Sequence, residues 1–152
     1  GASTLGVGLL VGGVIFNIVG GSLSDKADEA WAQMLKAENE VNEICSYLNE
    51  LYCVAMNFNN SLITVNACYQ RHFEKLKRIV VEKRKVFWDD FTEEERTITE
   101  NTVLLVGLLF KMCKTKLVFK DEVTDNNIVN EYAVNKTIQD AKKFIADNGL
   151  YI

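Results

Sequence analysis

The sequence predicts an all-α protein in which a long amphipathic helix, or a helical hairpin, packs with two further helices behind a glycine-rich apolar N-terminal helix. Three observations lead to this fold class. No proline interrupts the 152 residues, so long helices are permitted. Apolar residues recur every seven positions over residues 34–79. The length is that of one ordinary domain, which is enough chain to bury a core without disulfides or a metal.

The start of the chain differs in composition from the rest. Seven of the nine glycines lie in the first 21 residues, among leucine, valine, isoleucine and phenylalanine. The spacing of Gly8, Gly12, Phe16 and Gly20 places them on one helical face, along which another helix can approach closely. We expect this face to serve membrane contact or self-association.

The composition changes near residue 22, and no low-complexity linker divides the remaining chain. We therefore predict a glycine-rich apolar segment over residues 1–22 and a helical bundle domain over residues 23–152.

The heptad pattern that follows has two registers. One holds Met34, Val41, Leu48, Ala55, Leu62, Tyr69 and Leu76. The complementary register holds Ala37, Ile44, Leu51, Phe58, Val65, His72 and Ile79. Such a pattern is typical of helices that bury one face against another helix. We predict a helix seam that includes Leu48, Leu51, Leu62, Val65 and Leu76.

This segment has two possible structural interpretations. The unbroken heptad favours one continuous helix from about residue 24 to residue 85. The alternative is a helical hairpin that closes at residues 57–60, where three asparagines, which are poor helix formers, cluster around Phe58.

Charge is distributed unevenly along the same segment. Residues 25–50 hold seven acidic residues and two lysines, whereas residues 71–85 hold seven basic residues and two glutamates. This asymmetry suits the dipole of a single helix, and it suits equally an antiparallel partner, either the other arm of a hairpin or a second copy of the chain. The predicted basic patch consists of Arg71, Lys75, Arg78, Lys83 and Arg84.

The basic patch has a structural and a functional interpretation. It is either a solvated helix end or a surface that attracts acidic lipid headgroups or an acidic partner. Phe87, Trp88 and Phe91 follow directly. They resemble an interfacial anchor, or they form the turn that packs the next helix on the first.

The second half of the chain contains two further helical segments. Thr92 and Glu95 form a predicted capping box, and the helix that they open runs to about Lys114. Its residues 103–110 are apolar on all sides but too few to span a bilayer, so we expect this run to be buried in a bundle. A short strand is predicted at residues 117–119, then a polar loop, then a last helix from about residue 130 that ends before Gly149.

The residues needed for catalysis or metal binding are sparse. His72 is the only histidine, and its heptad position indicates a core or interface side chain. We expect four buried free thiols, with two disulfides as the alternative, at Cys45, Cys53, Cys68 and Cys113. The sequence therefore predicts no catalytic residue, no metal site and no cofactor, and we do not expect an enzyme.

The segments 26–30, 40–45 and 100–105, which read KADEA, EVNEIC and ENTVLL, resemble uncharacterised bacterial proteins in which a glycine-rich apolar segment precedes a long helix. This resemblance covers most of the chain and implies the same layout. It implies no activity and no catalytic or binding residue.

The net charge of −4 argues against a nucleic-acid partner, because such proteins need a surplus of lysine and arginine. We expect a membrane-associated, self-assembling helical protein, with a membrane-perturbing or pore-forming protein as its most specific version. The alternative is a soluble coiled-coil interaction or scaffold protein. The expected partners are a second copy or a helical protein, and a lipid membrane in the first case; the expected location is membrane-associated or cytoplasmic.

Overall fold

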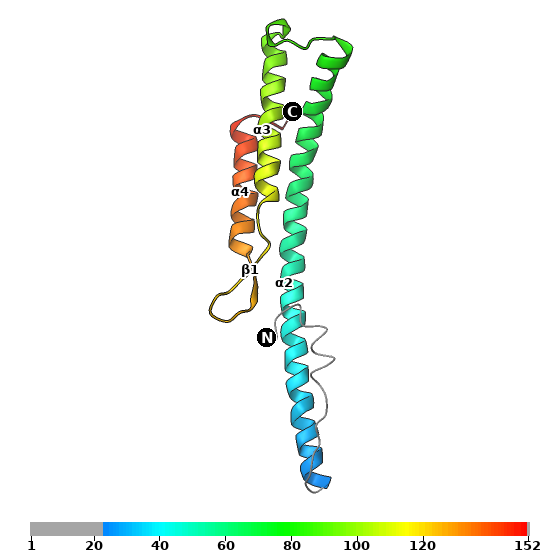
Figure 1. The fold of residues 1–152 in the computed structure, drawn as a ribbon, viewed down its shortest axis with the longest axis vertical. Helices are drawn as coiled ribbons and strands as arrows, with labels where there is room; N and C mark the ends of the chain where they lie inside the picture. The colour runs from blue at the N-terminus through cyan, green and yellow to red at the C-terminus, as the bar shows by residue number, and fades with distance from the viewer. Residues whose placement is uncertain (1–22, 152) are drawn as a thin grey trace. The chain divides into compact units, whose positions relative to one another are not determined.

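The computed structural model describes residues 23–151 and shows a predominantly helical chain (Figure 1). Its α-helices over this range are α2 (Leu23–Lys77), α3 (Glu93–Cys113) and α4 (Glu131–Asp147). This confirms the all-α class and the two further helices after the long one. The predicted face of Gly8, Gly12, Phe16 and Gly20 lies outside the described residues.

The described residues group into two compact units. One unit contains residues 23–53 and 118–129, and the other contains residues 54–117 and 130–151. The second unit holds the latter part of α2 together with α3 and α4, and we call it the three-helix unit.

Helix α2 passes through residues 57–60 without interruption. The continuous helix is therefore confirmed, and a hairpin closed at this point is wrong. The low helix propensity of the asparagines is outweighed because Phe58, which lies among them, is buried on the packed face of the helix. The asparagines themselves point to the exposed side, where their polar groups remain solvated.

The helix ends earlier than the predicted residue 85. A five-residue π-helix, Arg78–Glu82, follows α2, and Lys83 N donates to Arg78 O at 3.1 Å. Arg84 then adopts a left-handed backbone with φ of 54°. This conformation is unfavourable for a residue with a side chain, and it turns the chain toward α3. We call residues 78–92 the corner.

The core of the three-helix unit lies along one stripe of α2. The predicted register supplies Phe58, Val65, His72 and Ile79, all of which are buried. The neighbouring stripe is displaced by one residue from the predicted one. Its buried members are Val54, Ser61 and Cys68, whereas Ala55, Leu62 and Tyr69 are half-buried. The buried positions keep the seven-residue repeat, so the predicted period is right and only the position of this second stripe is wrong by one residue.

Helices α3 and α4 complete this core with one face each. The buried side chains of α3 include Thr102, Leu105, Leu108 and Met112, and those of α4 are Val134, Ala141 and Ile145. Beyond α4, Gly149 has φ of +61° and turns the chain so that Leu150 becomes fully buried. The predicted role of Gly149 as the residue that terminates the last helix is confirmed.

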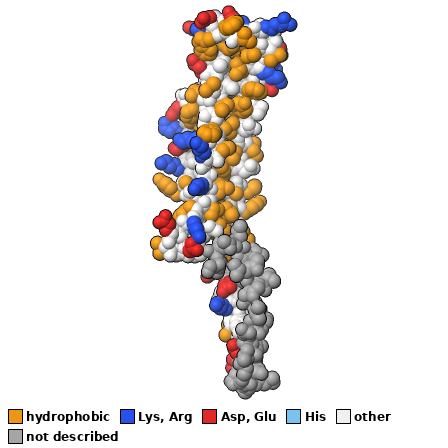
Figure 2. All heavy atoms as spheres, viewed as in Figure 1, with side chains coloured by type: hydrophobic (Ala, Val, Ile, Leu, Met, Phe, Trp, Pro, Cys, Tyr) orange, Lys and Arg blue, Asp and Glu red, His pale blue; other side chains and the backbone are white. Residues whose placement is uncertain are grey.

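The apolar run of α3 is only partly buried. Val103, Val106 and Phe110 remain exposed, so the prediction that the whole run is buried was wrong. The reason is geometric, since the described neighbours of α3 contact one side of the helix and leave the other in solvent. The space-filling view shows apolar side chains that reach the surface along the helices (Figure 2).

A β-hairpin follows α3. Strand β1 (Val118–Lys120) pairs antiparallel with β2 (Asn127–Val129), with Val118 opposite Val129. The predicted short strand is therefore present, displaced by one residue, while its partner strand was not predicted. Asp121 organises the turn, because its Oδ2 accepts a hydrogen bond from Thr124 N at 3.1 Å.

The four cysteines all carry free thiols, as expected, but only Cys68 is buried. The prediction that all four are buried was wrong for Cys45, Cys53 and Cys113, which are exposed. On an amphipathic helix the surrounding apolar residues do not by themselves indicate the face on which a cysteine lies.

Candidate interaction surfaces

The first part of α2 carries a row of exposed apolar side chains. They are spaced alternately by three and four residues, which keeps them on one helical face. We call this row the outer seam; its residues are Trp31, Met34, Glu38, Val41, Cys45, Leu48 and Tyr52.

The outer seam is open to solvent along its length. Trp31 is 59% exposed, Leu48 43% and Tyr52 62%. Exposed apolar residues are common on proteins when they occur singly, whereas a row of them at coiled-coil spacing is typical of helices that pack against another helix.

Glu38 is the one charged residue of the outer seam. It makes no hydrogen bond or ion pair with any residue that the structure describes. The helix around it is acidic, since residues 27–53 contain six acidic residues and a single lysine, Lys36.

The predicted seam residues fall into different environments. Leu48 is exposed on the outer seam, Val65 is buried in the three-helix unit, and Leu51, Leu62 and Leu76 are half-buried. Sequence reasoning missed Trp31, Glu38, Cys45 and Tyr52 as one row. The alternating spacing of three and four residues could have indicated this row. It was missed because Glu38 and Cys45 interrupt the apolar pattern, and because the predicted register uses the positions one residue before Glu38, Cys45 and Tyr52.

The predicted basic patch is exposed but not uniform. Arg71 Nη2 donates to the carbonyl of Tyr151 at 3.4 Å and so helps to hold the C-terminal turn. Lys83 is paired with Glu95, whereas the side chains of Lys75, Arg78 and Arg84 make no hydrogen bond or ion pair with the described residues. The patch is therefore split between structural contacts and free cations.

Glu95, in the first turn of α3, holds the corner in place. The predicted capping box is confirmed, because Thr92 N donates to Glu95 Oε2 at 3.0 Å and Glu95 N donates to Thr92 Oγ1 at 3.3 Å. The same buried carboxylate accepts hydrogen bonds from Lys83 Nζ at 2.7 Å and Lys85 Nζ at 2.6 Å. The bonds from Lys83 and Lys85 lower the pKa of Glu95 to about 2, and the Thr92 backbone bond contributes to the same shift.

Apolar side chains project from the corner. Phe87 is 71% exposed, and Val86 and Trp88 are also exposed. The Trp88 ring is held by Phe91, at 5.9 Å between ring centroids, and by the Arg96 guanidinium, 5.4 Å from the ring centroid. Trp88 therefore packs on the following helix while part of its ring remains accessible, and its role as an interfacial anchor stays a prediction.

His72 is buried in the three-helix unit, with 4% of its surface exposed. Neither ring nitrogen has a hydrogen-bond partner of normal geometry among the described residues. Burial is the main cause that lowers the pKa of His72, and Lys75 and Arg71 act in the same direction. The Leu150 backbone opposes them, so the C-terminal turn lies close to the ring.

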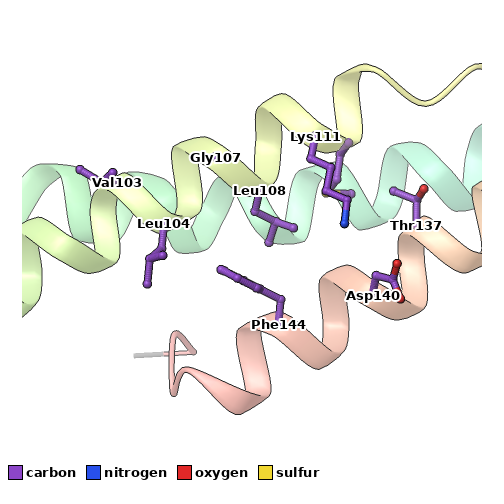
Figure 3. Close-up of a pocket in the computed structure, with 9 residues that line it drawn as sticks. Val103, Leu104, Gly107, Leu108, Lys111, Thr137, Asp140 and Phe144 are labelled. Atoms are coloured by element: carbon purple, nitrogen blue, oxygen red, sulfur yellow. The ribbon is translucent and has the colours of Figure 1, made fainter.

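A shallow apolar groove of about 330 Å³ lies between α3 and α4. Leu104 and Leu108 point toward Phe144, and Lys111, Thr137 and Asp140 lie at the other end (Figure 3). Gly107 lines the groove without a side chain, and a Cβ atom there would meet nothing within 4 Å. The groove is therefore space left open between two helices rather than a closed cavity.

Within the described part of the chain, no helix is long and apolar enough to cross a membrane, and no cluster of histidine, cysteine and acidic residues could hold a metal ion. No protein family model, no curated protein and no solved structure matches this sequence.

Proposed function

We propose that this chain is a coiled-coil interaction protein that binds another helix through the outer seam of α2. The observation that carries the proposal is the open row from Trp31 to Tyr52, at alternating spacings of three and four residues. A helix laid along this row would cover its apolar side chains. Each fully buried side chain of this size contributes ~1.5 to 3 kcal/mol, and several together offset the cost of association.

Trp31 provides a direct test, because it lies on the outer seam and the chain has only one other tryptophan, Trp88. In a Trp88→Phe protein, an amphipathic helical peptide with leucine at its a and d positions is expected to shift the Trp31 fluorescence to shorter wavelength. Leu48→Asp in the same background should abolish the shift, because it places a second charge on the seam.

Ile63→Asp is the matched control. Ile63 is an exposed apolar residue of α2 outside the outer seam, so this variant should bind the peptide as the parent does. The proposal is refuted if helical peptides leave the fluorescence of Trp31 unchanged and sedimentation shows no self-association either.

A second candidate is a membrane-associated, self-assembling protein. It is supported by the apolar sequence of residues 5–19 and by the exposed Val86, Phe87 and Trp88 beside the free cations Arg78 and Arg84. Flotation with neutral and anionic liposomes, with and without residues 1–22, tests it. Flotation that needs those residues would support membrane insertion, and a protein that stays at the bottom of the gradient would exclude this function.

A further inference from the structure

We propose that the outer seam selects a basic amphipathic helix, with a lysine or arginine placed opposite Glu38. This inference rests on the proposed helix-binding function and names the chemistry of the partner. Its starting point is the place of Glu38 within the seam, between Met34 and Val41.

A helix that covers Met34 and Val41 must also cover Glu38, because the three side chains lie within two turns on one face. The Glu38 carboxylate is then removed from water. No described residue of its own chain donates a hydrogen bond to it. Burial of a carboxylate without a partner is strongly unfavourable, so the bound helix must supply the donor.

A second copy that pairs through the same seam is a poor source of that donor. In a parallel pair Glu38 would face the same glutamate of the other copy, and like charges at such a position oppose association. The surrounding acidic residues would add to the repulsion, since each copy brings five of them besides Glu38 against one lysine over residues 27–53.

A lysine or arginine on the partner helix can supply the hydrogen-bond donor that the Glu38 carboxylate needs. Its side chain forms a charge-assisted hydrogen bond with Glu38, and its apolar stem packs on the neighbouring seam residues. A single polar residue of this kind in a coiled-coil seam also fixes the register of the two helices. Glu40 and Glu43 lie off the seam on the other side of α2, so they attract a basic partner only through longer-range electrostatics.

The test uses three synthetic peptides of about 22 residues, the length of the outer seam, with leucine at the a and d positions. At the central a position and at the flanking sites, one peptide carries lysine, the second carries glutamate and the third carries neutral residues. Titrated into the Trp88→Phe protein, the lysine peptide should bind about tenfold or more tightly than the glutamate peptide. The difference should shrink as salt is added.

Glu38→Leu is the decisive variant, and Glu40→Leu is its control with the same change of charge off the seam. Glu38→Leu should remove the preference for the lysine peptide and increase self-association in sedimentation experiments, because the seam becomes entirely apolar. Glu40→Leu should keep most of the preference.

Several results would overturn the inference. One is equal binding of the three peptides to the parent protein, which would leave the helix-binding function intact. Another is an equal loss of preference in Glu38→Leu and Glu40→Leu, which would mean that net charge and not the seam position selects the partner. If no peptide binds and the chain stays monomeric, the proposed function and the inference both fail.

Discussion

Glu95 joins three parts of the corner through one carboxylate. It caps α3 and accepts hydrogen bonds from Lys83 and Lys85, which lie twelve and ten residues earlier in the chain, respectively. Because the side chain is buried, these bonds replace the water that the carboxylate loses. The corner therefore depends on the charge of a single residue.

Glu95→Gln should lower the free energy of unfolding at pH 7. Because the pKa of Glu95 is lowered from 4.5 to about 2, its contribution is complete above pH 4.5 and is lost as the pH falls toward 2. Urea unfolding measured at pH 7 and again near pH 2 should show a gap between parent and variant that closes at the lower pH. Glu93→Gln, at an exposed position of the same helical turn, is the control and should behave as the parent at both values.

His72→Leu should stabilise the protein, because it removes two buried nitrogens that have no hydrogen-bond partner of normal geometry among the described residues. The expected gain is about 1 kcal/mol or more at neutral pH. The pKa of His72 is lowered below 6.5, so the unfolded chain takes up a proton first and the parent loses stability as the pH falls through that value. Melting temperatures between pH 7.5 and pH 5 should decline less in the variant; an identical decline would contradict this account.

At the scale of single residues, some contacts could be predicted from the sequence and others could not. The capping box at Thr92 and Glu95 was predictable because the pattern is local and its hydrogen bonds lie within one helical turn. The hydrogen bonds from Lys83 and Lys85 to Glu95 were not predictable. They depend on a π-helix and on the left-handed backbone of Arg84, and no local sequence pattern predicts either.

At the scale of elements, helix positions were predictable and helix faces were less so. Heptad spacing and the absence of proline were sufficient for α2, and Gly149 marked the end of the region that contains α4. The exposed side of α3 could not be predicted, because Val103 and Leu105 are equally apolar and only the neighbouring helices decide which is covered. The outer seam of α2 was not predicted for a similar reason, because the longer heptad assigned neighbouring positions to the packed face.

The two described glycines should respond in opposite ways to alanine. Gly107 lies within α3 and a Cβ atom there meets open space, so Gly107→Ala should stabilise the protein by about 0.5 to 1 kcal/mol. Gly149 has a positive φ, so Gly149→Ala should destabilise it by about 1 kcal/mol or more. Chemical denaturation of both variants checks the pair, and destabilisation by Gly107→Ala would show that α3 is closely covered at that point.

For the whole molecule, the described structure separates the residues that fold the chain from those that are free to bind. Val65 is 2% exposed, so Val65→Asp should cost more than about 4 kcal/mol and prevent stable folding. Leu48→Asp, on the outer seam, should cost about 1 kcal/mol or less. Thermal melting followed by circular dichroism distinguishes them, and a collapse of Leu48→Asp would place the outer seam within the folded core.

The short sequence separation of the corner contacts also has an expected effect on folding. A loop of about ten residues closes within ~10 to 100 ns, so Glu95 can meet Lys83 and Lys85 early and hold α2 and α3 together as a nucleus. The contact of Arg71 with Tyr151 joins residues eighty positions apart and must wait for α4. We therefore expect the corner to form before the C-terminal turn covers His72, and stopped-flow refolding of single-site variants would check this order.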